Sequence, residues 1–217
     1  MLECRAIRHA VLTLTMPPFL SHPLTAEAAL ALIELRHAPE LTALVQRNHA
    51  HLYRWLSWVS EVYREKDARA FIRHGLRRFV TQNGLVTGIW VGEWLAGVAD
   101  LHTVNWQARS ASLGYWLGEE WQGRGLVTLA CRALIHYAFD DLGLTRVEVH
   151  AATDNHRCRA IPERLGFRFE GVLPEAEWLH DHCVDHAVYA LTAEEWRAHQ
   201  ETAGRRFLSS HPEPVEG

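Results

Sequence analysis

The sequence predicts a mixed α/β (α+β) fold built on a mostly antiparallel central sheet. Residues from Leu85 to Leu117 alternate between two faces in three consecutive runs, which is the period of β-strands. From Leu126 to Leu142 the apolar residues recur instead at helical spacing, and Val147 to Ala151 alternate again. A meander followed by a strand–helix–strand connection is typical of a mixed sheet.

The part of the chain before the meander is predicted to hold one strand and two helices. Residues 28–34 are apolar and bounded by polar residues, which fits a strand or the front of a helix, and we interpret them as a strand. Pro39 opens a helix at a position where its missing N–H costs nothing, and apolar residues follow within 41–45. An amphipathic helix over Ala70–Phe79 ends before Asn83-Gly84.

The meander and the second half of the chain divide at glycine and polar turns. The turn Gly92-Glu93-Trp94 joins the first two strands into a hairpin, and the loop 105–110 leads to a third strand, Ala111–Leu117. The next elements are a helix closed by Gly143, a strand at 147–151, and a helix that is capped by Asp154 or Asn155 and ends at Gly166. A hairpin of Phe167–Val172 with Cys183–Leu191 follows, and a polar helix begins at about Ala193.

The sequence predicts one domain with a tail at each end. Residues 1–27 are poorly patterned and are interpreted as an extension, in which Met1 and Met16 are both candidate starts. The folded domain is expected to cover residues 28–200. Residues 201–217 end in a segment rich in Pro, Ser and Glu and are expected to be disordered.

Composition excludes several classes of protein. The chain has 217 residues, 48% of them hydrophobic, and a formal charge of −4, without the basic stripe that would hold a nucleic-acid backbone. No apolar stretch is long enough for a signal peptide or a membrane span. The cysteines form no CxxC pair, so we expect reduced thiols in a soluble, cytoplasmic protein; they are Cys4, Cys131, Cys158 and Cys183.

A histidine-rich segment near the C-terminus raises the question of a metal site. Its residues are His180, Asp181, His182, Cys183, Asp185 and His186. These ligand types suit zinc, but a zinc site normally shows paired ligand spacings on two segments. We therefore interpret the segment as a polar hairpin and expect no metal; the alternative is a metal-dependent hydrolase that uses His180, His182 and His186.

The loop Gln122–Thr128 lies between a predicted strand and a predicted helix. Free N–H groups and the dipole at a helix N-terminus attract anions, and Gly123 and Gly125 allow the backbone to approach one closely. Neither a GK[ST] ending nor GxGxxG spacing is present, which disfavours a nucleoside-triphosphate site. The residues alone indicate an anion site or a purely structural turn.

Two longer segments resemble a known family. The run Gly114-Tyr115-Trp116-Leu117-Gly118-Glu119-Glu120-Trp121-Gln122-Gly123-Arg124-Gly125 resembles the acetyl-CoA signature of the GNAT N-acetyltransferases, Q/R-x-x-G-x-G/A. The run from Asn155 to Phe167 looks like the second signature of the RimJ/RimL branch. The resemblance covers about Asn48 to Leu191 and implies the GNAT fold, with helices on both faces of a sheet that splays open between its middle strands.

The resemblance implies how acetyl-CoA binds. Pantetheine would lie in the splay against the backbone of residues 115–117, the pyrophosphate would sit on the N–H groups of residues 123–128, and Asn155 would reach the pantetheine amides. The implied cofactor residues are Tyr115, Trp116, Leu117, Gln122, Gly123, Arg124, Gly125, Leu126, Val127, Thr128 and Asn155.

The resemblance also implies catalytic roles. The N–H of Leu117 would stabilise the oxyanion, and Glu177 would act as general base, through water. Cys158 stands where most relatives have serine; a thiol can still donate the proton to the leaving sulfur, and the alternative is a buried, inert cysteine. Pro162 removes an N–H from its helix, so we expect the carbonyl of Cys158 to face water or ligand.

The acceptor is the least determined part of the prediction. Asn48, Trp55, Trp58 and Tyr115 are the candidates to line its pocket, because the family shapes that side with the helices before the central sheet. The RimL resemblance favours a ribosomal or other protein N-terminus as acceptor. A small amine such as a polyamine or an antibiotic, and a non-catalytic acyl-CoA sensor, are the alternatives. A homodimer is also expected from the resemblance.

Overall fold

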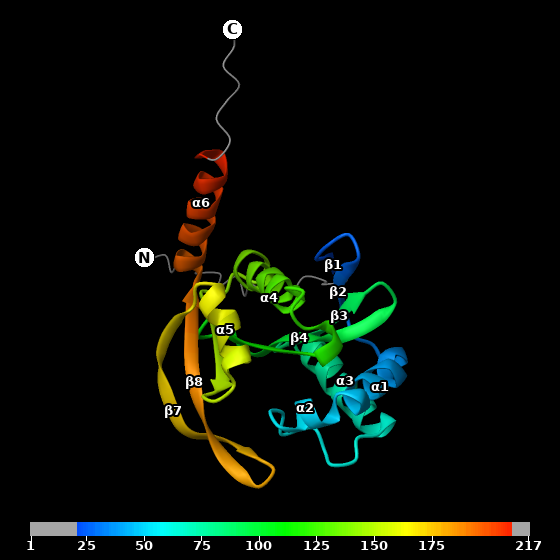
Figure 1. Ribbon diagram of the computed structural model, residues 1–217. Coiled ribbons are helices and arrows are strands. Elements are labelled where there is room, and N and C mark those ends of the chain that lie inside the picture. Colours follow the sequence, from blue (N-terminus) through cyan, green and yellow to red (C-terminus); the bar gives the residue numbers. More distant parts are fainter. Residues whose placement is uncertain (1–20, 210–217) are drawn as a thin grey trace, which may run out of the picture.

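The computed structural model describes residues 21–209, with side chains as far as residue 202 (Figure 1). Cys4, the choice between Met1 and Met16, and the last part of the expected tail lie outside the described residues. The sheet has eight strands in the order β1-β2-β3-β4-β5-β6-β8-β7. The strands are β1 Ser21–Pro23, β2 Ala28–Leu32, β3 Leu85–Val91, β4 Trp94–Asn105, β5 Ser110–Leu117, β6 Arg146–Ala152, β7 Arg168–Leu179 and β8 His182–Thr192.

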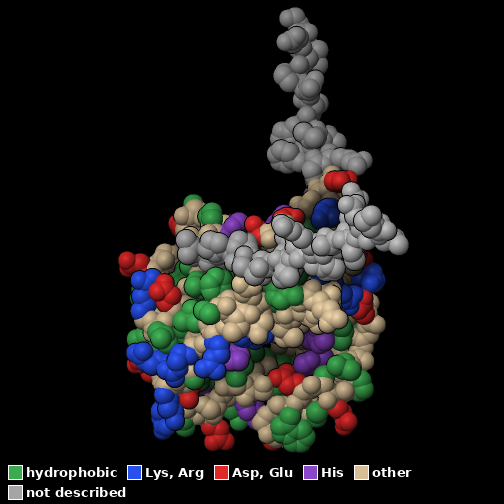
Figure 2. Space-filling model, turned by 180° about the vertical axis from the view of Figure 1, so that it is seen from behind, with side chains coloured by type: hydrophobic (Ala, Val, Ile, Leu, Met, Phe, Trp, Pro, Cys, Tyr) green, Lys and Arg blue, Asp and Glu red, His purple; other side chains and the backbone are tan. Residues whose placement is uncertain are grey.

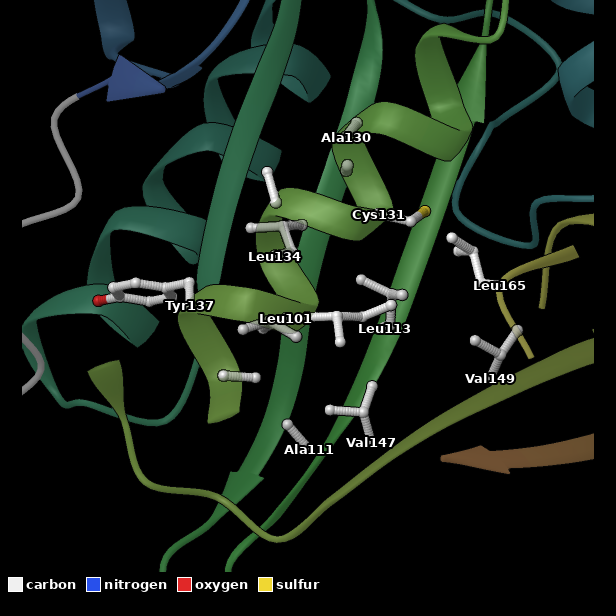
Figure 3. Close-up of a cluster of buried hydrophobic side chains, with 14 of the residues drawn as sticks. Leu101, Ala111, Leu113, Ala130, Cys131, Leu134, Tyr137, Val147, Val149 and Leu165 are labelled. Atoms are coloured by element: carbon white, nitrogen blue, oxygen red, sulfur yellow. The ribbon is translucent and has the colours of Figure 1, made fainter. Parts of the chain in front are cut away.

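The helices cover both faces of this sheet. They are α1 Ala38–Arg47, α2 His49–Tyr53, α3 Glu65–Val80, α4 Leu126–His136, α5 His156–Arg164 and α6 Ala193–Ser209. The side chains of α1 and α3 pack with Val86 and Val98 in one buried cluster. The side chains of α4 pack with Leu101 and Leu113 in another, on the opposite face (Figure 3). The predicted α/β class with helices on both faces is confirmed.

The sheet is mixed because one pair of neighbouring strands is parallel. All other neighbours are antiparallel, whereas β5 and β6 run parallel and pair only at residues 110–112 with residues 146–148. Beyond this short ladder, β5 continues to Leu117 and β6 to Ala152 without pairing to each other. The two strands therefore splay apart, as the family resemblance predicted.

Most elements coincide with the predicted periodicity. Pro39 lies at the start of α1, and Asn155, rather than Asp154, is the residue that caps α5. The helix predicted from Leu126 to Leu142 is α-helical only as far as His136 and continues as a π-helical turn, Tyr137–Asp141.

Several elements differ from those expected. Helix α2 was not predicted, and α3 begins at Glu65, before the predicted start at Ala70. Strand β1 lies inside the segment expected to be an extension; it is an exposed edge strand of three residues that ends in proline, so it leaves no alternating pattern. The final hairpin is longer than predicted, because bulges at Phe169/Gly171 and Leu173/Glu177 interrupt its alternation. Helix α6 leaves the sheet at the end of β8 and reaches Ser209, inside the expected tail (Figure 1).

Candidate active site

A cleft of about 2240 Å³ follows the splay between β5 and β6. Its walls come from the segment after α2, from β4, β5 and β6, from the loop before α4, from α5 and from the β7–β8 hairpin. Figure 2 shows a hollow near the middle of the rear face, with histidine and acidic side chains at its rim. The cleft brings together segments that lie more than a hundred residues apart in the chain.

The loop before α4 has the geometry of an anion site. Gly123 and Gly125 have φ values of +76° and +73°, and a Cβ at either position would meet no atom within 4 Å. Gly125 is the N-cap of α4, and no side chain caps the first turn. The N–H groups of this turn are therefore free to bind an anion, and the open space over both glycines gives it access.

The side chain of Arg124 points away from this anion site. It is the one residue of the predicted loop that does not line the cleft. Its guanidinium lies 4.9 Å from the centre of the Trp121 ring and donates to the carbonyl of Glu120 at 3.1 Å. Its charge is therefore directed to the outside of the molecule.

Two arginines of α5 supply positive charge to the loop instead. Arg157 donates to Oε1 of Gln122 at 3.0 Å, and Arg164 donates to the Thr128 hydroxyl at 3.2 Å. The amide nitrogen of Gln122 lies 3.0 Å from Nε2 of His51, which ties the loop to α2 as well. Sequence reasoning assigned no role to these arginines, although their spacing of seven places both on one face of a helix.

The edge of β5 that faces the splay has free backbone groups. The N–H of Gly118 donates to the carbonyl of Ala96 on β4 at 2.9 Å. Because successive N–H groups of an extended strand point to opposite edges, those of Leu117 and Tyr115 point toward β6. β6 has already separated at this level, so both groups are open to a ligand in the cleft.

Tyr115 crosses the cleft to α5. Its hydroxyl donates to the carbonyl of Cys158 at 2.9 Å, the carbonyl that Pro162 leaves without its usual helical partner. The expectation that this carbonyl faces water or ligand is therefore wrong. Burial raises the pKa of the Cys158 thiol against the opposing effect of a hydrogen bond with Tyr115, so the thiol is protonated at neutral pH.

Asn155 lies at the start of the same helix. Its Oδ1 accepts the backbone N–H of Cys158 at 3.1 Å, which is an N-cap bond. Its amide nitrogen has no hydrogen-bond partner among residues 21–202, and the residue lines the cleft. One half of the side chain orients the helix, and the other half can bind a ligand.

Glu177 is held from two sides. Oε1 accepts the Ser57 hydroxyl at 2.6 Å, and Oε2 lies 3.2 Å from Nε2 of His186. The hydrogen bond from His186, more than the one from Ser57, lowers the pKa of the Glu177 carboxyl against the effect of partial burial. Ser57 was not predicted, and His186 was considered only as a metal ligand.

Two further carboxylate–imidazole pairs lie along the same face of the sheet. Asp100 and His102 on β4 are 3.1 Å apart, and Glu148 and His150 on β6 are 3.2 Å apart. A Cβ on Gly114 would overlap Oδ1 of Asp100, so a larger residue at this position would force that carboxylate to move. The signal that sequence reasoning missed is an acid and a histidine two residues apart, which share one face of a strand.

Comparison with known proteins agrees with this geometry. The model of the acetyltransferase (GNAT) domain family matches residues 28–168. The chain belongs to the GNAT acetyltransferases. It is 35% identical to the putative ribosomal N-acetyltransferase YdaF of Bacillus subtilis, over 76% of this chain and 91% of YdaF. It is 30% identical to the ribosomal-protein-serine acetyltransferase of Escherichia coli, over 71% of this chain and 86% of the relative.

Solved structures of GNAT enzymes have the same fold. The ribosomal L7/L12 α-N-protein acetyltransferase RimL, in complex with coenzyme A, superimposes with a TM-score of 0.75 at 26% identity, over 80% of this chain and 98% of RimL. The microcin C7 self-immunity acetyltransferase MccE, in complex with acetyl-CoA and AMP, does so with a TM-score of 0.75 at 28% identity, over 82% and 99%.

One part of this GNAT cleft is aromatic. Trp55, Trp58 and Tyr115, which were predicted to line the acceptor pocket, all line the cleft. The ring of Trp58 lies 5.0 Å from that of Phe71 and 6.0 Å from that of Trp116, and it is 36% exposed. These side chains form an apolar wall next to the charged pairs.

Asn48 lies outside the cleft, contrary to its predicted place in the acceptor pocket. It is 3% exposed, donates to the carbonyl of Leu44 at 3.0 Å and accepts the N–H of Glu119 at 2.8 Å. Both ends of its amide are therefore used to join α1 to the segment after β5. Its burial and its satisfied hydrogen bonds give it a structural role.

The β7–β8 hairpin closes on α2 above the cleft. The ring of His180 stacks on Tyr53 with centroids 3.6 Å apart, and its Nε2 lies 2.8 Å from the Tyr53 carbonyl. His182 contacts Asp181, on the same hairpin.

No three His, Cys, Asp or Glu residues gather as a metal site within the described part of the chain. None of the helices described between residues 21 and 209 is long and apolar enough to span a membrane.

Proposed function

We propose that this GNAT enzyme transfers the acetyl group of acetyl-CoA to the α-amine of a protein N-terminus. The observation that carries the proposal is the cleft itself, in which a free strand edge at Leu117 and an uncapped helix N-terminus at Gly125 face one cavity. The relatives support a protein acceptor, because YdaF and the E. coli protein are both named as acetyltransferases of ribosomal proteins.

The residues present fit a coenzyme A molecule. The N–H groups at the start of α4 would bind its pyrophosphate, together with the charges of Arg157 and Arg164. The residues that line this part of the cleft are Gln122, Gly123, Gly125, Leu126, Val127 and Thr128. Arg124 points outward, toward Trp121 and Glu120, and would not contact the pyrophosphate. The edge of β5 at Tyr115–Leu117 and the free amide nitrogen of Asn155 would hold the pantetheine arm.

The chemistry then follows from the chain's own groups. Acetyl-CoA supplies an acetyl group that is already activated as a thioester. The Leu117 N–H would donate to the carbonyl oxygen as it gains negative charge. The Cys158 thiol, which burial keeps protonated, would give a proton to the departing sulfur. The Glu177–His186 pair would take the proton from the amine as the C–N bond forms and the C–S bond breaks.

A turnover experiment tests this function. Purified protein is mixed with acetyl-CoA and either peptides with free N-termini, the same peptides with blocked N-termini, or polyamines, and the released thiol and the mass of the product are measured. We expect acetylation of free N-termini only. Acetylation restricted to polyamines would instead favour a small-molecule acceptor; the spermidine N(1)-acetyltransferase of E. coli is a more distant relative, 26% identical over 61% of its length. Tight binding of acetyl-CoA without turnover on any amine would favour a sensor.

The homodimer and the cytoplasmic location stay predictions. Size-exclusion chromatography with light scattering measures the first, and fractionation of the source cells measures the second. A monomer at enzyme concentrations used in the turnover assay would show that dimerisation is not required for activity.

A further inference from the structure

We propose that Nδ1 of His186 is the atom that removes the proton from the acceptor amine, and that Glu177 is a positioning residue that orients the imidazole. The inference rests on the proposed acetyl transfer and assigns its proton acceptor. It changes the role that the family resemblance implied for Glu177, which was that of general base.

The contacts of Glu177 determine which nitrogen of His186 is free. Oε1 already accepts the Ser57 hydroxyl at 2.6 Å, and Oε2 lies 3.2 Å from Nε2 of the imidazole. A lone pair on Nε2 would face this negative oxygen at close range and be repelled by it, so the proton of the neutral ring belongs on Nε2. A neutral imidazole has one N–H, which leaves the lone pair on Nδ1. The carboxylate therefore selects the tautomer in which Nδ1 can act as a base.

The surroundings of His186 leave Nδ1 available. No residue between 21 and 202 gives it a hydrogen-bond partner, and the side chain lines the cleft with 15% exposure. The strand residues opposite it, Ala152 on β6 and Leu173 on β7, are uncharged. No charged group on the neighbouring strand positions competes for Nδ1.

The titratable groups near His186 come from three strands. Glu177 approaches from β7, and His150 approaches edge-on from β6 with ring centroids 6.2 Å apart. On β8 itself, Asp185 accepts the N–H of Glu175 at 2.8 Å and points to the opposite face, as alternate residues of a strand do. Glu177 is therefore the one carboxylate in direct contact with the ring among the described residues.

Proton affinity favours an imidazole over this carboxylate. An α-ammonium group has a reference pKa of about 7.7 to 8.0, an imidazole about 6.5 and a glutamate about 4.3. The hydrogen bonds from His186 and Ser57 lower the pKa of Glu177 further, which makes it a weaker base. Proton transfer is most efficient when the base has a pKa near the working pH, and the reference value of an imidazole is nearer to neutral pH than that of a glutamate.

The pH dependence of kcat/KM for a peptide substrate separates the two assignments. In His186→Gln we expect kcat/KM to fall about 100-fold, and we expect the part of its rise with pH that comes from deprotonation of the enzyme's base, the enzyme limb, to disappear. In Glu177→Gln we expect kcat/KM to fall about tenfold and its rise with pH to persist, because the imidazole is still present but is no longer oriented. The limb that belongs to the peptide's own amine stays in every variant.

The matched control is His150→Gln, which removes the neighbouring imidazole and leaves the Glu177–His186 contact in place. The His150→Gln variant is expected to keep the rise of kcat/KM with pH that comes from the enzyme. The proposal is overturned if Glu177→Gln or His150→Gln abolishes the limb while His186→Gln only moves it, or if no variant changes it. Thermal melting and CoA affinity are measured for each variant, so that a misfolded protein is not mistaken for an inactive one.

A second readout does not depend on activity. The nitrogen-15 chemical shifts of His186 in the protein without substrate report which ring nitrogen carries the proton. We expect the Nε2–H form in the wild type and a mixture of tautomers in Glu177→Gln. An Nδ1–H form in the wild type would overturn the proposal even if no peptide is ever acetylated, so the tautomer is tested apart from the function.

Discussion

The hydroxyl of Tyr115 donates a hydrogen bond of 2.9 Å to the carbonyl of Cys158. The bond joins β5, on one side of the splay, to α5, the helix that follows β6 on the other side. Pro162 makes the bond possible, because it withholds the N–H that would otherwise use this carbonyl. The same proline that removes a hydrogen bond inside α5 therefore frees a carbonyl for a hydrogen bond across the cleft.

Tyr115→Phe is predicted to lower the free energy of unfolding by about 1 to 2 kcal/mol, because the buried carbonyl loses its partner. It should also weaken CoA binding, because α5 is no longer tied to β5. Urea denaturation and calorimetric titration with CoA measure the two effects. The control is Tyr63→Phe: the Tyr63 hydroxyl is buried without a partner in the described structure, so its removal should not destabilise the protein. Equal losses in both variants would argue against the role of the Tyr115 bond.

Cys158→Ser is predicted to keep kcat within about threefold of the wild type or to raise it, because a hydroxyl donates a hydrogen bond more strongly than a thiol. Cys158→Ala should lower kcat by about tenfold or more, because no proton donor remains. Single-turnover rates with a peptide acceptor are the measurement. Cys183→Ala, at an exposed cysteine on β8, serves as the control. If Cys158→Ala turns over like the wild type, the thiol has only a packing role.

Gly125→Ala is predicted to destabilise the protein by about 1 kcal/mol, because the left-handed φ of +73° at this position is strained for alanine. It should also weaken CoA binding at least tenfold, because the new methyl group occupies the anion site. Gly92→Ala is the matched control, because Gly92 has a φ of +57°, equally open space and a place in the β3–β4 turn. It should show the same loss of stability with unchanged CoA affinity. Equal CoA affinity in the two variants would remove the loop from the proposed pyrophosphate site.

Glu170→Gln is predicted to reduce stability in a pH-dependent way. Hydrogen bonds from Arg146 and then Arg168 lower the pKa of Glu170 to about 2. Because this pKa lies below the unfolded value of about 4.3, the ionised carboxylate stabilises the fold above pH 4.3, and the contribution is lost as the pH falls toward 2. The variant should lose about 1 kcal/mol at pH 7, allowing for solvent screening, and the difference from the wild type should shrink below pH 4.3.

Urea denaturation at pH 7, 4 and 3 measures this difference. Glu194→Gln, which removes a carboxylate without an ion-pair partner in the described part of the chain, is the control and should differ little from the wild type at any of these pH values. A difference for Glu170→Gln that stays constant from pH 7 to pH 3 would contradict the assigned ion pairs.

Local patterns were sufficient for most of the fold. Alternation predicted β3, β4 and β5, helical spacing predicted α4, and Pro39 and Asn155 marked the starts of α1 and α5. These features depend on residues within a few positions of one another, so a single sequence carries them. Strand β1 was not predicted, because it is stabilised by pairing with β2 and has no buried face of its own.

The candidate site was predictable only where a motif lies in one segment. The loop at Gln122–Thr128 and the helix start at Asn155 are such segments, and both line the cleft. The predicted place of Asn48 failed, because its hydrogen bond to Glu119, 71 positions away, gives no signal in the sequence near either residue.

The sequence by itself determined most of the elements, the two glycines with left-handed backbone and the acid and thiol that face the cleft. Only the tertiary structure decided their partners: Ser57 and His186 for Glu177, and Tyr115 for the carbonyl of Cys158. The reason is physical. Backbone conformation follows from neighbours along the chain, whereas a side chain finds its hydrogen-bond partner only after packing has brought distant strands and helices into contact.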